Sequence, residues 1–328
     1  MSMTRTRVSV CMPTYNYARF LPEAIESVLA QNFSDFEFLI IDDCSVDDTR
    51  RIVEPYAAAD DRIVFSVNER NIGMVENWNL CLARARGEFI KFLFGDDMFS
   101  HKNALGIMVS RMDSDDGISL VGSPRNLIDE GSSVLEQISC LPSGTVAPGT
   151  DIINRCLLDQ RNQNLIGEPS VVMFRKSQAL RGFNPNYKQL VDLEMWFHLL
   201  EQGKYAYLEE TLSSFRVHSE QQTTRNILSL AYIDDLSLLY DEYLCKGYIE
   251  CGLLHKRFLV YNQYYKIWKK ARQQKIDKGL ARQKIASRYG SWEFFAHMPF
   301  YKIYNPCQKL GKLAVKLLRR GINGADGR

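Results

Sequence analysis

The stretch Phe36-Glu37-Phe38-Leu39-Ile40-Ile41-Asp42-Asp43 is an almost continuous apolar run that ends in two carboxylates. A run of this length and composition is typical of a strand that is buried on both faces of a parallel sheet. An earlier run, Val8–Met12, is closed by Pro13, and a helical pattern spans Leu21–Ala30 between the two. Strand, helix and strand in this order predict a βαβ unit.

A second unit of the same kind follows in the sequence. Helical patterns cover 51–59 and 74–85, and strand patterns cover 63–67 and 88–94. Three strands would then end in polar turns, at 13–16, 42–45 and 95–97. Open α/β sheets bind ligands beyond the carboxyl ends of their strands. We therefore expect a Rossmann-like, mostly parallel sheet flanked by helices, with a ligand site at these turns. Further strand patterns lie at 118–121, 170–174 and 206–208, and further helical patterns at 102–112 and 189–201.

Composition indicates the domain organisation. The chain has 328 residues, of which 45% are apolar and 24% charged, as in globular proteins. From about residue 228 the pattern becomes helical and rich in Tyr, Lys and Leu, which predicts one domain over 1–226 and a helical region over 227–328. The net charge of +2 indicates no particular partner, and we expect no nucleic acid among the partners.

The cysteines and the termini indicate the compartment. The eight cysteines form no CxxC pair, and the chain shows no secretory signal. It also lacks a run of about 18 apolar residues that would span a bilayer. These features predict reduced thiols and a cytoplasmic protein.

The doublet Asp42-Asp43 is the first candidate binding group. A carboxylate after a strand is often only a helix cap or a turn residue. Beside Pro13-Thr14-Tyr15-Asn16, however, a carboxylate can accept the imide N–H of a uracil while Tyr15 offers an aromatic face to the base.

Asp96 and Asp97 form a second doublet, separated from a strand pattern by Gly95 alone. Adjacent carboxylates repel each other unless a cation or several donors neutralise them. Mg²⁺ and Mn²⁺ prefer such oxygen ligands together with substrate phosphates, and they stabilise a departing diphosphate. The alternative is a simple turn before the helix at 102–112.

Two further candidates lie later in the chain. On a helix, Asp192 shares a face with Trp196 and can act as the general base that deprotonates an acceptor hydroxyl; alternatively it is only a helix N-terminal acid favoured by the dipole. The sequence Phe215-Arg216-Val217-His218 precedes a polar string that suits a loop over a diphosphate. Arg216 or His218 would then contact phosphate or metal, although a lone histidine is more commonly a surface or core residue.

Taken together, these residues resemble the family 2 glycosyltransferases, which have the glycosyltransferase A fold. The resemblance covers residues 8 to about 224 and rests on motifs in the same order. These motifs are 8–16, 31–49, Asn71-Ile72-Gly73 with 85–90, Asp96-Asp97, 191–196 and 215–218.

The resemblance implies an inverting transfer of a sugar from a nucleotide diphosphate, with uridine favoured. It further implies that Asp43 binds the base, Tyr15 stacks on it and Pro13 shapes the turn. Asp97 would be the principal ligand of Mn²⁺ or Mg²⁺, Asp96 would lie near the donor ribose or sugar, and His218 would contact phosphate or metal. Asp192 would be the general base. With Arg216 from the loop pattern, the candidate site residues are Pro13, Tyr15, Asp43, Asp96, Asp97, Asp192, Arg216 and His218.

This sequence departs from the family pattern at two positions. Phe94 stands where the metal motif often has a further Asp, so metal binding would depend more on the donor diphosphate. Val191 stands where an acid often precedes the base.

The last part of the chain is basic and amphipathic. Residues 309–320 read Lys-Leu-Gly-Lys-Leu-Ala-Val-Lys-Leu-Leu-Arg-Arg. As a helix this pattern suits an anionic membrane surface, which would bring the enzyme to lipid-linked saccharide acceptors at the inner face of the cell membrane. A helix docked on the protein with a solvated basic face is the alternative.

Two rival functions remain open at this point. A non-catalytic member that binds nucleotide or serves as a scaffold would have no need to keep Asp43, Asp97 and Asp192 together. A dehydrogenase or epimerase would need a Gly-rich turn after the first strand, and the turn that follows Pro13 contains no glycine.

Overall fold

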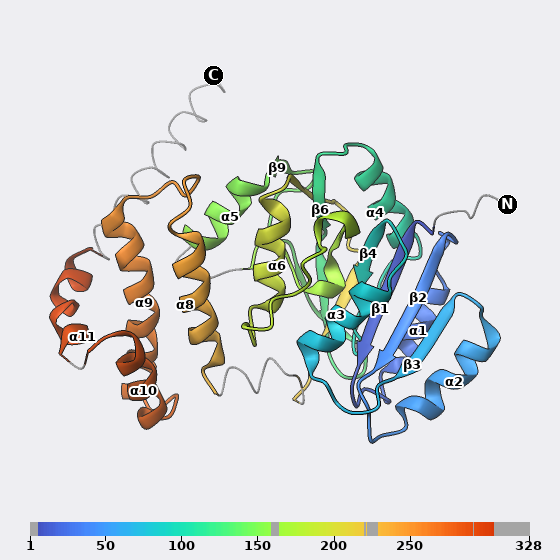
Figure 1. Ribbon diagram of the computed structural model, residues 1–328, viewed down its shortest axis with the longest axis horizontal. Helices are drawn as coiled ribbons and strands as arrows, with labels where there is room; N and C mark the ends of the chain where they lie inside the picture. The colour runs from blue at the N-terminus through green and yellow to red at the C-terminus, as the bar shows by residue number, and fades with distance from the viewer. Residues whose placement is uncertain (1–5, 159–163, 220, 222–228, 291, 305–328) are drawn as a thin grey trace. The chain divides into compact units, whose positions relative to one another are not determined.

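The computed structural model describes residues 6–158, 164–219, 221, 229–290 and 292–304 (Figure 1). The chain divides into two compact units, residues 1–225 and 226–328. In the described ranges, no helix is long and apolar enough to span a membrane.

The N-terminal unit is built on an eight-stranded sheet. Its strands are β1 (Val8–Thr14), β2 (Phe36–Asp42), β3 (Ile63–Val67), β4 (Phe89–Phe92), β6 (Ile118–Gly122), β9 (Val146–Pro148), β10 (Met173–Arg175) and β11 (Lys204–Tyr207). They are arranged in the order β3-β2-β1-β4-β10-β6-β11-β9. The first four are parallel, and β10 runs antiparallel to both of its neighbours. Because β1 lies between β2 and β4, the strand order reverses there, and this is where such sheets bind ligands.

A second sheet lies beyond the end of β4. Its strands are β5 (Met98–Phe99), β7 (Arg125–Ile128), β8 (Val134–Ile138) and β12 (Ser213–Arg216), in the order β5-β12-β7-β8. Ser214 in β12 pairs with Met98 in β5, and Met98 directly follows Asp97. The sheet therefore brings the end of β12 to the turn after β4 that carries Asp96 and Asp97, which we call the acidic turn. The sequence patterns did not reveal these short strands.

Helices cover both faces of the large sheet (Figure 1). On one face α1 (Leu21–Leu29), α2 (Thr49–Ala59) and α4 (Ala104–Asp113) share a core with β1 and β2, in which Ile25, Val53 and Met108 are buried. On the other face lie α3 (Met74–Arg84) and α6 (Val191–Leu200), with α5 (Gly149–Leu158) packed on α6. Trp78 of α3 packs against Phe92, and Trp196 of α6 packs against Phe174.

The expected α/β class is confirmed, and most of the expected elements are found with ends that differ by one or two residues. Two differences have a clear structural reason. Pro13 does not close the first strand, because β1 continues to Thr14 beside Asp42 of β2, while its pairing with β4 has already ended at Cys11. The strand expected at 170–174 is shorter, because Pro169–Val171 forms a 3₁₀ turn, η1, before β10 begins. A proline suits the first position of such a turn. A second 3₁₀ turn, η2, covers Lys176–Gln178.

The C-terminal unit is helical. It contains α8 (Ala231–Tyr243), α9 (Leu253–Arg272), α10 (Lys278–Arg288) and α11 (Glu293–Ala296). Its core is largely aromatic and includes Phe258, Tyr261, Tyr264, Phe294 and Tyr301.

Candidate active site

Hydrogen bonds connect the turn after β1 to the turn after β2. The Asn16 N–H donates to Ser45 Oγ at 2.8 Å, and the Val46 N–H donates to Asn16 Oδ1 at 2.9 Å. Asn16 and Cys44 both have left-handed backbones, with φ of 59° and 63°, which is uncommon for residues other than glycine. The two turns therefore form one fixed surface at the carboxyl end of the sheet, on which Tyr15 is 43% exposed.

Asp43, the first residue after β2, is buried and accepts three hydrogen bonds. Its Oδ1 accepts from the Ile72 N–H and from Asn68 Nδ2, both at 2.9 Å, and its Oδ2 accepts from the Gly73 N–H at 2.9 Å. Gly73 has a φ of 90°, which favours glycine. The carboxylate thus orders the loop between β3 and α3. An ionised carboxylate has about four lone-pair sites, so a base N–H can still be accommodated.

Asp96 and Asp97, in the turn after β4, are almost completely buried, at 5% and 1% exposure. A Cβ on Gly95 would lie 2.9 Å from Leu21 Cδ2 and 3.1 Å from Thr14 Oγ1. The absence of a side chain at this position lets the acidic turn approach the end of β1 closely. The acidic pair and the turn after β1 therefore meet at the switch point of the sheet.

Arg216, the last residue of β12, is 1% exposed and uses all three guanidinium nitrogens within the protein. Nε donates to the Asp96 carbonyl at 2.8 Å, Nη1 to the Asp129 carbonyl at 3.0 Å, and Nη2 to the Glu23 carboxylate at 2.6 Å. Its backbone N–H donates to Asp97 Oδ1 at 2.9 Å. Arg216 thus fastens the acidic turn to α1 and to the turn between β7 and β8. The phosphate contact expected of it stays a prediction.

His218 reaches the same acidic turn from the segment after β12. Its Nε2 lies 3.1 Å from Asp96 Oδ2. The ring is buried against Tyr17 and Phe20, at centroid distances of 6.0 and 5.1 Å. The structure therefore brings together four of the residues singled out in the sequence, namely Asp96, Asp97, Arg216 and His218.

The acidic turn has the properties of a cation site. In and around this turn, three buried polar atoms have no hydrogen-bond partner among the described residues: Thr14 Oγ1, Asp96 Oδ1 and His218 Nδ1. Such atoms are costly to bury without a partner, and oxygen atoms are the ligands that Mg²⁺ and Mn²⁺ prefer. Burial, and then the neighbouring Asp96 carboxylate, raises the pKa of Asp97 well above its usual range. A nearby positive charge would favour the ionised form.

The protein supplies few ligands of its own for such a cation. Within the ranges that the structure describes, no group of three or more His, Cys, Asp or Glu side chains is arranged to hold a metal ion. Phe94, at the position where the family pattern often has another Asp, packs against Trp78 with ring centroids 4.9 Å apart. These residues fit a cation whose coordination is completed by substrate phosphates.

A buried lysine lies next to the acidic turn. Lys91 in β4 is 0% exposed, and its Nζ donates to the Ser170 carbonyl and, at 3.0 Å, to the Phe92 carbonyl. Ser170 Oγ accepts the Phe94 N–H at 3.1 Å. Burial lowers the pKa of Lys91 to about 7, and the Asp97 carboxylate opposes this shift. Lys91 and Ser170 together hold the backbone that leads to the acidic pair.

Asp192 lies in the first turn of α6, where it is half-buried and its Oδ1 accepts the Leu193 N–H at 2.8 Å. Trp196 on the same helix donates from Nε1 to the Gly167 carbonyl at 3.0 Å. Gly167 lies just before η1, which contains Ser170. The Ser170 hydroxyl accepts the N–H of Phe94, a residue between β4 and the acidic turn. The helix that carries Asp192 is therefore connected to that turn, while the role of Asp192 as a base stays a prediction.

Several residues that organise the site were missed in the sequence. Glu23, Asn68 and Ser170 had no distinguishing pattern, because each acts through a partner far away in the chain. Lys91 did carry a signal: a lysine inside an apolar strand pattern must find partners when it is buried. Its position between Ile90 and Phe92 could have marked it.

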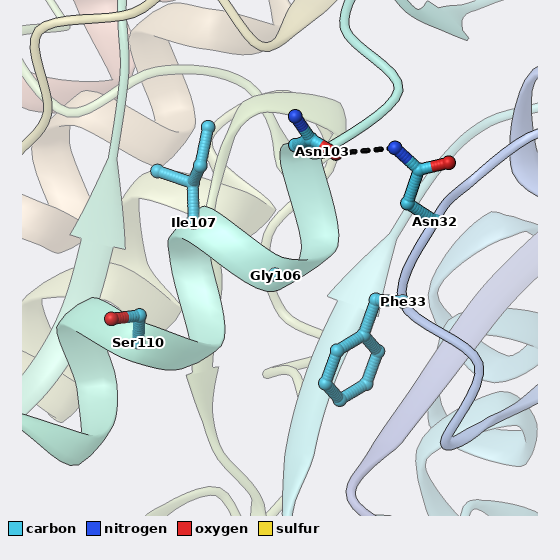
Figure 2. Close-up of a pocket in the computed structure, with 6 residues that line it drawn as sticks. All are labelled: Asn32, Phe33, Asn103, Gly106, Ile107 and Ser110. Atoms are coloured by element: carbon cyan, nitrogen blue, oxygen red, sulfur yellow. Dashed lines mark hydrogen bonds between the residues drawn. The ribbon is translucent and has the colours of Figure 1, made fainter.

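A shallow groove of about 450 Å³ lies elsewhere in the N-terminal unit, between the loop after α1 and helix α4 (Figure 2). Asn32 Nδ2 donates to Asn103 Oδ1 across it at 2.6 Å. The residues that line it are Asn32, Phe33, Asn103, Gly106, Ile107 and Ser110. None of them is charged, and none belongs to the acidic site.

The chain belongs to glycosyl transferase family 2, whose sequence profile matches residues 9–176. A Bacillus subtilis protein named as the glycosyltransferase EpsE is 30% identical over 245 residues, which cover 71% of this chain and 81% of that protein. Another, named as the teichuronic acid biosynthesis glycosyltransferase TuaG, is 29% identical over 64% of this chain and 79% of its own. The protein is thus a glycosyltransferase, as its motifs predicted.

Solved structures share the fold. Staphylococcus aureus TarS 1–349 in complex with UDP-GlcNAc has a TM-score of 0.64 at 17% identity, over 85% of this chain and 78% of that one. The mannosyltransferase PcManGT from Pyrobaculum calidifontis, in complex with GDP-Man and Mn²⁺, has a TM-score of 0.56 at 15% identity, over 96% of this chain and 86% of that one. The glycosyltransferase A-like fold is therefore confirmed.

Proposed function

We propose that this protein is an inverting glycosyltransferase that transfers a sugar from a UDP-sugar to a hydroxyl group of a saccharide or lipid-linked saccharide in cell-surface polysaccharide synthesis. The observation that carries the proposal is the meeting of Asp96, Asp97 and His218 at the switch point, with buried oxygens that lack partners among the described residues. The relative named for teichuronic acid biosynthesis supports the role in polysaccharide synthesis, and the neighbour bound to UDP-GlcNAc supports a UDP-sugar as the donor.

The domain over 1–226 would bind the donor. Asp43 accepts the base N–H with its remaining lone pair, Tyr15 packs its exposed ring on the base, and Pro13 shapes the turn. Uracil offers an imide N–H and a flat face, which suit these two side chains.

The acidic turn would hold the diphosphate end of the donor. Asp97 and His218 would hold Mn²⁺ or Mg²⁺, Asp96 would lie near the donor ribose or sugar, and Arg216 would add positive charge beside the diphosphate. A divalent cation there would supply charge neutralisation for the departing nucleoside diphosphate. Arg216 holds Asp96 and Asp97 in place, because it bonds both residues and connects the acidic turn to Glu23 of α1.

Asp192 would deprotonate the acceptor. Its carboxylate takes the hydroxyl proton as the acceptor oxygen attacks the anomeric carbon. The bond from that carbon to the diphosphate oxygen breaks, and its electron pair leaves with the nucleoside diphosphate. A single displacement of this kind inverts the anomeric configuration.

The basic tail at 309–320 lies outside the described residues. Its contact with an anionic membrane, and a location at the cytoplasmic face of the cell membrane, belong to this proposal and rest on the sequence pattern.

Release of nucleoside diphosphate tests the proposal. We expect the protein with Mn²⁺ or Mg²⁺ to release UDP from at least one UDP-sugar, and EDTA to suppress this release. Asp192→Asn should lower kcat by about 10²–10⁴-fold with little change in UDP affinity, because only proton transfer is lost. Asp116→Asn is the control, since the Asp116 side chain is fully exposed.

Three results would count against the proposal. UDP binding without any turnover would favour a non-catalytic member of the family. Normal turnover in Asp192→Asn would remove that residue from the base role. A product with retained anomeric configuration by NMR would contradict the single displacement.

A further inference from the structure

The last described segment of the C-terminal unit packs along α9 with one of its sides. Residues 293–304 are helical apart from His297. Phe294 is stacked on Tyr261 with ring centroids 5.1 Å apart, and Tyr301 is stacked on Phe258 at 5.3 Å. Both Phe294 and Tyr301 are buried, so this side of the segment is part of the aromatic core.

The opposite side of the same segment exposes large apolar side chains. Trp292 is 79% exposed, Phe295 54%, Phe300 39% and Ile303 70%. At about 100° per residue these positions fall on one side of a helix, opposite Phe294 and Tyr301. We call these four residues the apolar face. Contiguous exposed apolar groups of this kind commonly mark a contact with a membrane or another macromolecule.

The elements around the apolar face are strongly basic. Residues 253–304 contain twelve Lys or Arg and only two acids, Asp277 and Glu293, whereas residues 229–252 contain five acids and one lysine. Two of the twelve, Lys284 and Arg288, pair with Asp234 and Asp241 of α8. The unit is thus divided in charge, although the whole chain has a net charge of only +2.

Basic side chains lie directly beside the apolar face. The guanidinium of Arg272 lies over the Trp268 ring at 5.0 Å, and Trp268 contacts Phe295 with ring centroids 6.4 Å apart. Lys302 is exposed between Phe300 and Ile303. Apolar and cationic groups therefore share one surface.

We propose that the apolar face docks in the plane of an anionic lipid bilayer surface, with its four side chains at the boundary between headgroups and acyl chains. Large apolar side chains flanked by Lys and Arg are the combination that binds such surfaces, and each nearby basic residue adds attraction to anionic lipid. Aromatic side chains are enriched at this depth of the membrane. The apolar face consists of other residues than the basic tail at 309–320. The proposal also holds whether or not the protein transfers a sugar.

Charge favours lipid over the other occupants of the face. A second copy of the chain would bring two strongly basic surfaces together, and like charges oppose such association. The C-terminal sequence from residue 305 is itself basic, with six Lys or Arg against Asp326, and is disfavoured for the same reason. A hydrated polyanion would satisfy the lysines and arginines but would leave the apolar side chains in water.

Vesicle co-sedimentation of the full-length protein tests the proposal. We expect binding to phosphatidylcholine vesicles that contain about a third phosphatidylglycerol, weaker binding to pure phosphatidylcholine, and a loss of binding at high salt. Phe295→Ser combined with Ile303→Ser should weaken binding by about tenfold or more. Leu180→Ser is the matched control, because Leu180 is 80% exposed in the N-terminal unit.

Tryptophan fluorescence gives a second, direct readout. Trp292 is far more exposed than Trp78 and Trp196, and Trp268 is half-buried in contact with Phe295, so anionic vesicles should shift the emission of Trp292 and, less strongly, of Trp268 to the blue, and brominated lipid should quench it. Trp292→Phe should reduce this signal to the Trp268 contribution and still sediment with vesicles, because phenylalanine keeps an aromatic group at the face. Circular dichroism establishes that each variant is folded.

Four outcomes would overturn the proposal. One is equal vesicle binding by the double variant and the parent. Another is a dimer in light scattering that the double variant abolishes, which would assign the face to a second copy. A third is loss of vesicle binding in Leu313→Ser with Leu317→Ser but not in the face variant, which would assign the contact to the tail. The fourth is face-dependent binding to an acidic polysaccharide with none to anionic vesicles.

Discussion

The Arg216 N–H donates to Asp97 Oδ1 at 2.9 Å, although the two residues are 119 positions apart. The contact depends on the second sheet, in which β12 lies beside the strand that starts directly after Asp97. The guanidinium of Arg216 holds the Asp96 carbonyl as well. The acidic turn is thus positioned by the protein itself, with Asp96 Oδ1 left without a hydrogen-bond partner among the described residues.

Replacing Arg216 should destabilise the protein. Arg216→Met would leave the buried Asp96 carbonyl and the half-buried Asp129 carbonyl without their Arg216 donors, at a cost of about 2–4 kcal/mol in the free energy of unfolding. Glu23→Gln should cost clearly less, because the Glu23 side chain is 44% exposed and keeps an acceptor for Arg216. Urea unfolding of both variants measures the difference. Equal stability of the two variants would show that the Arg216 contacts to the carbonyls contribute little.

Replacing Asp43 should lower both the stability of the protein and its affinity for UDP. Asp43→Asn retains one acceptor oxygen for the three donors at Ile72, Gly73 and Asn68, so we expect a loss of about 1–3 kcal/mol in stability. UDP affinity should fall as well, because the base N–H loses an ionised acceptor. Asn68→Ala separates the two effects, since it removes the side-chain hydrogen bonds from Asn68 to Asp43 and Asn77 and leaves the Asp43 carboxylate. A normal UDP affinity in Asp43→Asn would contradict the base-binding role.

Lys91 should make stability depend on pH. Burial lowers the pKa of Lys91 to about 7 in the folded protein, below the value of about 10.4 for a lysine in an unfolded chain. The unfolded chain therefore binds more protons above pH 7, and stability should rise with pH through this window. From pH 7 to 8.5 we expect the parent to gain about 1–2 kcal/mol relative to Lys91→Met.

Urea unfolding at these two pH values measures the Lys91 effect. The comparison with Lys91→Met removes the contributions of the buried cysteines, which titrate in both proteins. A constant difference between the two proteins across this range would mean that Lys91 keeps its proton in the folded state.

The order of elements along the chain was readily predicted from the sequence. Strands such as Phe36–Asp42 and Ile63–Val67 are apolar runs bounded by turns, and the helices around Ile25 and Trp78 show a regular apolar face. The acidic turns were found for the same reason, because they directly follow buried strands. These signals are local in the sequence.

The second sheet and the contacts that organise the site are not local. Strands β5 and β12 have two and four residues, too few to show a period. Arg216 was identified as a candidate, but its partners Glu23 and Asp129 are brought to it only by the topology of the sheets. The burial of Lys91 against the Ser170 carbonyl likewise depends on η1, which no sequence pattern predicts.

The most direct test of the donor site is a calorimetric titration with UDP, with and without Mn²⁺, on the parent protein, Asp97→Ala and the exposed control Asp116→Ala. We predict that the parent and the control bind UDP more tightly with Mn²⁺ than without it. Asp97→Ala should lose this gain while it keeps the weak metal-independent binding, because the base contacts at Asp43 remain. A gain with Mn²⁺ that survives in Asp97→Ala, or no UDP binding by the parent protein in any condition, would contradict the account.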